Sequence, residues 1–184
     1  MFIQTETTPN PQTLKFLPGR PVLSDGVREY RTAGEAASSP LASRLFDVSG
    51  VTGVLLGTDF IAVTRDETDW AHLKPAVLGA IMEHYLAGEA VIGDQAHGDD
   101  DSEFFDAADE ETVGMIKELI EERVRPAVAQ DGGDITFKGF RDGVVFLTMR
   151  GACSGCPSST ATLRHGIQNL LRHYVPEVEE VRAV

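Results

Sequence analysis

The chain has 184 residues, of which 42% are hydrophobic, so it can build ordinary packed cores in one domain or two small ones. Its formal net charge of -13 argues against a nucleic-acid partner, and no apolar run approaches the roughly 20 residues that a membrane span needs. The segment from Met1 to Thr8 has neither the apolar pattern of a signal peptide nor the Arg- and Ser-rich composition of a presequence. We therefore predict a cytoplasmic protein of bacterial type, without nucleic-acid or membrane partners.

Most of the negative charge lies in one segment, residues 94–112, which contains nine acidic residues and no Lys or Arg. Such a self-repelling run cannot bury enough surface to fold alone. We therefore predict one domain over residues 1–92, a flexible acidic linker over residues 93–110 and a second domain over residues 111–184. Phe104 and Phe105, within the linker, are either solvated linker residues or a small docking element.

The first part of the chain is predicted to form a small antiparallel sheet with helices on one side. Alternating or β-rich runs predict strands within residues 1–17, 27–31, 51–56 and 60–64. Pro40 suits the first turn of a short helix, and a longer amphipathic helix begins near Trp70. Pro75 is expected to set off the first turn of that helix from the rest. His72 and His84 are twelve residues apart without a metal-like spacing, so we interpret both as helix-flank or surface side chains.

The second part is predicted to have the element order α-β-β-α-β. An apolar stripe predicts a helix that Pro126 either ends or kinks, and the Asp-Gly-Gly-Asp run at 131–134 is interpreted as a turn. Strands are expected at 135–140, 144–149 and around 178–184, and the last helix is expected to have Pro157 in its first turn. The predicted fold class is thus α+β, with each domain an antiparallel sheet packed against helices.

The only two cysteines, Cys153 and Cys156, have the spacing C-x-x-C and lie just before the last helix. Backbone N–H groups and the positive end of a helix dipole both favour a thiolate at such a position. Gly151 and Gly155 allow tight turns, so we expect the loop to leave both sulfurs uncovered. The pattern predicts either a metal half-site or a redox pair.

Counting ligands separates the possible chemistries but does not decide among them. Iron-sulfur clusters and zinc usually have four protein ligands, and one chain supplies two thiolates. His165 and His173 lie well along the following helix, where they cannot easily converge on a loop at its start. A complete all-cysteine site therefore requires two chains related by a two-fold axis. The alternatives are a dithiol oxidoreductase, with Cys153 attacking and Cys156 resolving, and a zinc ion that bridges two chains.

Several stretches make the sequence resemble a known family. The Asp-Gly-Gly-Asp run at 131–134 and the stretch Gly-Ala-Cys-Ser-Gly-Cys-Pro-Ser-Ser at 151–159 resemble the C-terminal domain of NifU-type proteins. The stretches Thr-Pro-Asn-Pro at 8–11 and Ser-Pro-Leu-Ala at 39–42 resemble the N-terminal domain of the two-domain Nfu proteins. The resemblance covers nearly the whole chain apart from the acidic linker.

The resemblance implies an iron-sulfur carrier without enzymatic activity. It implies that Cys153 and Cys156 are the cofactor and metal ligands of a labile [4Fe-4S] cluster shared across a homodimer. It also implies transfer of the cluster, received from an upstream scaffold, to apo-protein clients such as aconitase-like enzymes and lipoyl synthase. The resemblance further implies that the first domain contributes to the choice of partner.

Overall fold

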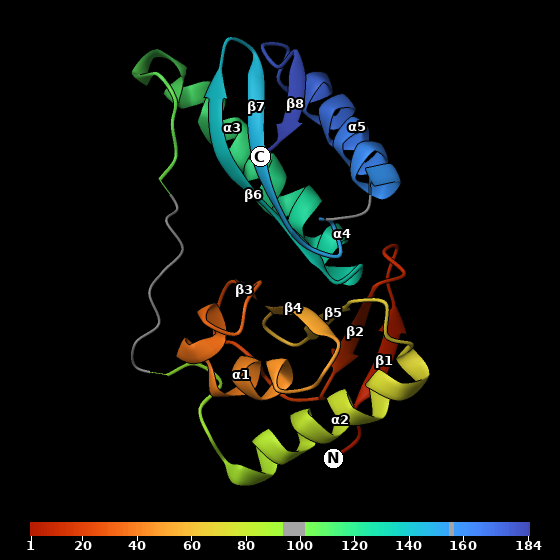
Figure 1. Ribbon diagram of the computed structural model, residues 1–184. Coiled ribbons are helices and arrows are strands. Elements are labelled where there is room, and N and C mark those ends of the chain that lie inside the picture. Colours follow the sequence, from red (N-terminus) through yellow and green to blue (C-terminus); the bar gives the residue numbers. More distant parts are fainter. Residues whose placement is uncertain (94–101, 155–156) are drawn as a thin grey trace. The chain divides into compact units, whose positions relative to one another are not determined.

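The computed structural model describes residues 1–93, 102–154 and 157–184, with the side chains of residues 157–159 excepted. The chain divides into two compact units, Met1–Gly98 and Asp99–Val184. Each unit is a sheet covered by helices (Figure 1), so the predicted α+β class is confirmed. Within the described residues, no helix combines the length and the hydropathy needed to cross a membrane.

The first unit contains a five-stranded antiparallel sheet with the order β1-β2-β5-β4-β3. Its strands are β1 Gln4–Thr7, β2 Thr13–Leu17, β3 Arg28–Tyr30, β4 Val51–Leu56 and β5 Ile61–Arg65. Its helices are the short 3-10 turn η1 Glu35–Ser38, α1 Pro40–Phe46 and α2 Trp70–Ala87. The fully buried side chains of Phe16, Leu41 and Ile81 are part of one apolar core built from the sheet and both α-helices. The strands predicted for this part of the chain are therefore all present.

Local sequence signals fix the ends of α1 and α2. The Ser39 Oγ accepts a hydrogen bond from the Ala42 N–H at 3.1 Å and caps α1. Asp69 caps α2 in the same way, and α2 ends at Gly88, whose φ of 68° is left-handed. The prediction that Pro75 separates a first turn is wrong, since α2 runs unbroken from Trp70 to Ala87. A proline near the start of a helix removes one backbone hydrogen bond, which the capped and packed helix tolerates.

The second unit follows the predicted order α-β-β-α-β. Its helical segments are η2 Ala107–Asp109, α3 Glu110–Leu119, the π-helical turn η3 Ile120–Val124, α4 Arg125–Gln130 and α5 Pro157–Tyr174. Its strands are β6 Gly133–Arg141, β7 Val144–Gly151 and β8 Glu180–Ala183, in the order β6-β7-β8. Ile116, Ile135 and Leu147 are fully buried members of its own apolar core, which is separate from that of the first unit.

The sheet of the second unit is mixed. β6 and β7 pair antiparallel, as expected, but β8 pairs with β7 in parallel. The expectation of an antiparallel sheet is therefore wrong for β8. The physical reason is the connection, because α5 carries the chain back along the sheet and lets β8 run in the direction of β7.

Phe104 lies against the edge of β6 in the second unit. Its N–H donates to the Lys138 carbonyl at 3.1 Å, and its carbonyl accepts from the Phe140 N–H at 2.9 Å. The ring covers Gly139, where a Cβ atom would come within 2.4 Å of it, and lies 5.2 Å from the Phe146 ring. Residues 94–101, eight of the eighteen residues of the predicted linker, lie outside the described residues, so the linker boundaries stay a prediction. The docking element considered for Phe104 and Phe105 is thus a contact within the chain.

Candidate functional site

Cys153 lies where β6 begins and β7 ends. Gly133 and Gly151 face each other in the β6–β7 pair, so neither strand has a side chain at this end of the sheet. A Cβ atom on Gly133 would lie 2.3 Å from the Cys153 Sγ, closer than real atoms approach. Gly133 therefore provides the surface on which the sulfur rests, and we call residues Gly132 and Gly133 the glycine ledge.

Backbone hydrogen bonds hold the loop on this ledge. The Ala152 N–H donates to the Gly132 carbonyl at 3.2 Å, and the Ser154 N–H donates to the Gly151 carbonyl at 3.1 Å. Gly151 adopts a φ of 63°, which side-chain-bearing residues rarely adopt. On the far side, the Thr160 hydroxyl in α5 donates to the Cys153 carbonyl at 2.9 Å. The turn is therefore tied to β6, to β7 and to the helix that follows.

The thiol of Cys153 is buried, which corrects two expectations from the sequence. The residue is 6% exposed and belongs to the apolar core, so the sulfur is covered rather than uncovered. Burial, together with the carboxylates of Asp131 and Asp134, raises the pKa of Cys153 to about 12 instead of lowering it. The helix dipole is outweighed because the side chain turns towards the ledge and the core. A thiol in this environment is protonated at neutral pH, the opposite of what an attacking cysteine needs.

Cys156, the second predicted ligand, lies outside the described residues, as does Gly155. The helix predicted after it begins at Pro157, as expected, and continues to Tyr174. The chain therefore resumes its described course one residue after Cys156. The pairing of Cys153 with Cys156 in one site stays a prediction.

An ion pair that the sequence did not predict lies directly behind the ledge. Asp134, expected in a turn, is the second residue of β6 and only 2% exposed. Both of its oxygens accept hydrogen bonds from Arg125, at 2.9 and 3.0 Å, and Arg125 also pairs with Glu121 at 2.7 Å. Burial lowers the pKa of Arg125, but its two carboxylate partners outweigh burial and raise it above the ordinary value. The only sequence signal was the Asp-Gly-Gly-Asp run itself, which points equally to a turn.

Three of the four histidines in the described part of the chain are exposed. His165 and His173 are exposed on α5, and His72 is exposed on α2. His84, interpreted as a helix-flank or surface residue, is instead fully buried, and neither ring nitrogen has a hydrogen-bond partner in the described part of the chain. Burial lowers its pKa. The described residues contain no group of three or more His, Cys, Asp or Glu side chains placed to hold a metal.

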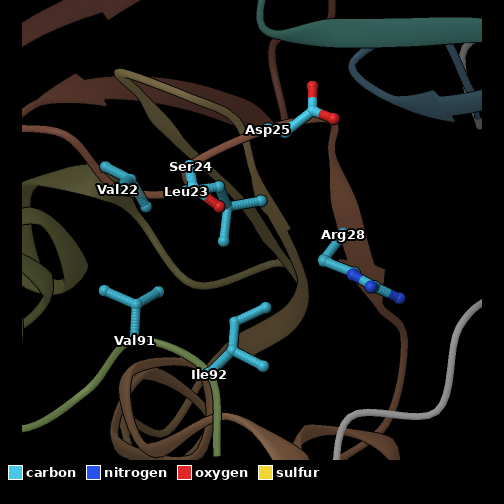
Figure 2. Close-up of a pocket in the computed structure, with 7 residues that line it drawn as sticks. All are labelled: Val22, Leu23, Ser24, Asp25, Arg28, Val91 and Ile92. Atoms are coloured by element: carbon cyan, nitrogen blue, oxygen red, sulfur yellow. The ribbon is translucent and has the colours of Figure 1, made fainter.

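The first unit has a cavity of about 370 Å³ on its surface. Figure 2 shows its aliphatic side chains grouped together, with the Arg28 guanidinium directed away from them. The residues that line it are Val22, Leu23, Ser24, Asp25, Arg28, Val91 and Ile92. None of these described lining residues is a cysteine or histidine, so the cavity offers no thiolate or imidazole ligand. The chemistry of the cysteine pair belongs to the second unit.

Two family models match the chain, one in each unit. Residues 3–88 match the model of the Nfu/NifU scaffold N-terminal domain, and residues 116–182 match that of the NifU-like domain. The human "NFU1 iron-sulfur cluster scaffold homolog, mitochondrial" is 48% identical over all of this chain and 72% of its own length. The Arabidopsis thaliana "NifU-like protein 4, mitochondrial" is 47% identical over 98% of this chain and 65% of its own length.

A solution structure of a NifU-like protein from Saccharomyces cerevisiae is also similar, with 28% identity and a TM-score of 0.47. It covers 52% of this chain, and the match includes 87% of the yeast chain.

The relatives overturn the predicted location. Those from human, Drosophila sechellia and Arabidopsis are all named as mitochondrial proteins. The prediction of a bacterial-type cytoplasmic protein is therefore wrong. It rested on the composition of Met1 to Thr8, and the composition of eight residues cannot assign a compartment.

Proposed function

Since this chain belongs to the two-domain Nfu (NifU-like) family, we propose that it acts in iron-sulfur cluster biogenesis as a carrier that binds a [4Fe-4S] cluster and passes it to apo-proteins. The observation that carries the proposal is Cys153 held on the glycine ledge, in the region that matches the NifU-like domain. The cluster is cargo, so the protein needs no catalytic residue and is not an enzyme.

Cys153 and Cys156 are the proposed ligands. A [4Fe-4S] cluster takes four thiolates and the chain contains two cysteines, so two chains together supply the complete set. The resulting homodimer forms around the cluster. Because a cysteine binds a metal as its thiolate, each cysteine loses its proton when the cluster binds.

A shared site suits a carrier better than a permanent cofactor site. Each chain contributes half of the ligands, so separation of the two chains leaves a cluster that a client with its own thiolates can take. Upstream scaffolds that supply the cluster and apo-proteins that accept it are the proposed partners. The names of the relatives, which include "iron-sulfur cluster scaffold", support a role in this process.

Anaerobic reconstitution of the full chain with iron and sulfide tests the proposal. The expected product has about two irons and two sulfides per chain and the broad visible absorption of a [4Fe-4S] cluster. Incubation with an apo-form of a [4Fe-4S] protein should then move the absorption to that protein. A chain that takes up no iron above the level of a chain lacking both cysteines would overturn the proposal.

The two rival functions make different predictions for the same preparation. A dithiol oxidoreductase turns over in a disulfide-reduction assay without any metal. A bridging zinc site retains zinc and no iron after purification. We expect neither result, because the buried Cys153 thiol is not activated for attack and the human relative is named an iron-sulfur cluster scaffold homolog.

A further inference from the structure

The ion pair of Arg125 and Asp134, next to the glycine ledge in the chain, is buried on the Asp134 side and has several hydrogen bonds. Asp134 is buried and accepts hydrogen bonds from Arg125 on both oxygens, and Glu121 holds the same guanidinium from the other side. The two parallel bonds to Asp134 fix the relative orientation of both groups, which a single bond would not. The pair therefore locks the start of β6 to the start of α4.

The helix before the ledge departs from α-helical geometry just before Arg125. The π-helical turn Ile120–Val124 lies between α3 and α4, and Arg125 is the first residue after it. One extra residue in a turn rotates everything that follows by about 100° around the helix axis. Single π turns of this kind occur frequently at functional sites. Here the turn directly precedes Arg125, whose guanidinium donates to both oxygens of Asp134.

The pair is connected to Cys153 through two residues of backbone. Asp134 follows Gly133, on which the Cys153 sulfur rests, and Gly132 accepts the hydrogen bond from Ala152. The end of an edge strand frays unless something ties it down. Whatever fixes Asp134 therefore also fixes the ledge, and with it the position of the sulfur.

We propose that Arg125 and Asp134 are positioning residues that hold the glycine ledge in register and so place Cys153 for cluster binding. The proposal rests on the function proposed above. Replacement of a buried ion pair by apolar groups of similar size commonly leaves stability unchanged or increased, so stability alone is a weak reason to keep one. The role of this ion pair is to fix the position of the glycine ledge.

Thiol accessibility in the apo-protein tests the proposal without any cluster. In a full-length chain carrying Cys156→Ser, Cys153 is the only thiol, and its reaction with Ellman's reagent reports opening of the ledge. Arg125→Met should increase the rate by about tenfold or more, since it removes hydrogen bonds to a charged group. The loss of a positive charge would by itself disfavour the thiolate and slow the reaction. A faster reaction therefore reports movement.

Two further variants separate positioning from general weakening of the fold. Val181→Ala removes core contacts in β8, at the opposite edge of the sheet, and should leave the thiol rate close to its starting value. Arg125→Met combined with Asp134→Asn removes the unpaired buried charge. This double variant should regain stability in denaturant titrations while the thiol rate stays high.

Cluster loading completes the test in chains that retain Cys156. Arg125→Met should alter the visible circular dichroism of the reconstituted cluster, which depends on how the ligands are placed. A thiol rate that follows global stability in every variant, together with an unchanged cluster spectrum, would overturn the positioning role. Failure of the unaltered chain to take up any cluster would instead overturn the proposed function, and the thiol rates would still decide whether the pair holds Cys153.

Discussion

The two units share one plan, a sheet with helices packed on it, but the ends of their sheets differ. In the first unit, large side chains such as Phe16, Leu56 and Ile61 fill the core, and none of its residues is a cysteine. In the second unit, the β6–β7 pair ends in Gly133 opposite Gly151, and a thiol occupies the space that side chains would take. The comparison teaches that the candidate site is made by omitting side chains at one end of an otherwise ordinary sheet.

The largest effect is expected when either cysteine thiol of the second unit is removed. Cys156→Ser and Cys153→Ala should each reduce iron uptake on reconstitution to background, because a shared site would lose two of its four ligands. Cys153→Ala should also cost about 1 kcal/mol of stability, since that side chain is part of the core. Iron analysis of each variant checks the first effect and urea unfolding checks the second. Full loading of either variant would contradict the ligand assignment.

A side chain at Gly133 would make the second sheet end resemble those of the first unit. Gly133→Ala places a methyl group 2.3 Å from the Cys153 sulfur, so either the loop or the strand must move. We expect a loss of about 1–3 kcal/mol in the free energy of unfolding and a clear drop in cluster loading.

Gly114→Ala is the matched control for that substitution. Gly114 lies in α3 of the same unit, and a Cβ atom there meets nothing within 4 Å. Alanine is favoured over glycine in helices, so this variant should gain up to about 1 kcal/mol and load normally. Equal losses in the two variants would mean that the ledge has no special role.

A smaller effect is expected at the edge of β6, where Phe104 packs against the second sheet. Phe104→Ala removes the ring that covers Gly139 and should cost about 2 kcal/mol, since the side chain is partly buried. Phe105→Ala, at a residue that is 38% exposed, should cost less. Hydrogen exchange at the Phe140 amide, which bonds the Phe104 carbonyl, checks the result directly. Unchanged protection in Phe104→Ala would show that this segment does not cover the edge.

The buried polar groups of the two units sharpen the comparison further. Asp134 has charged partners, whereas neither nitrogen of His84 has a hydrogen-bond partner among the described residues. Burial lowers the pKa of His84 in the folded state, so the unfolded chain binds more protons below the ordinary value of 6.5. Stability of the first unit should therefore decrease as the pH falls below about 6.5.

Trp70, the only tryptophan, lies in the first unit and reports its unfolding by fluorescence. His84→Leu should flatten the pH dependence, whereas His72→Gln, at an exposed position on the same helix, should leave it unchanged. An equal pH dependence in the unaltered chain and in His84→Leu would show that another group is responsible.

Local signals in the sequence were sufficient for most of the fold. Strands were predicted on both sides of the Asp-Gly step at 142–143, and both of its residues have the positive φ that a hairpin turn needs. Pro40 lies in the first turn of α1, as expected. The direction of β8 was not predictable in this way, because it depends on the path of α5 over the sheet and not on the residues of the strand.

The environment of the site was much harder to predict than its residues. The spacing of Cys153 and Cys156 predicted a metal half-site or a redox pair, but it gave no sign that Cys153 is buried against Gly133, which lies twenty residues earlier in the chain. Arg125, which pairs with Asp134, directly follows a π turn, and the sequence pattern did not predict this turn. Contacts between segments, rather than patterns within them, decide both features.

Native mass spectrometry of the reconstituted protein tests the shared site most directly. We predict that the cluster-loaded species has the mass of two chains plus one [4Fe-4S] cluster, and that removal of the cluster by a chelator abolishes this species. A single chain that carries a complete cluster, or a dimer that carries one cluster for each chain, would contradict the central claim that two copies of Cys153 and Cys156 hold one cluster between them.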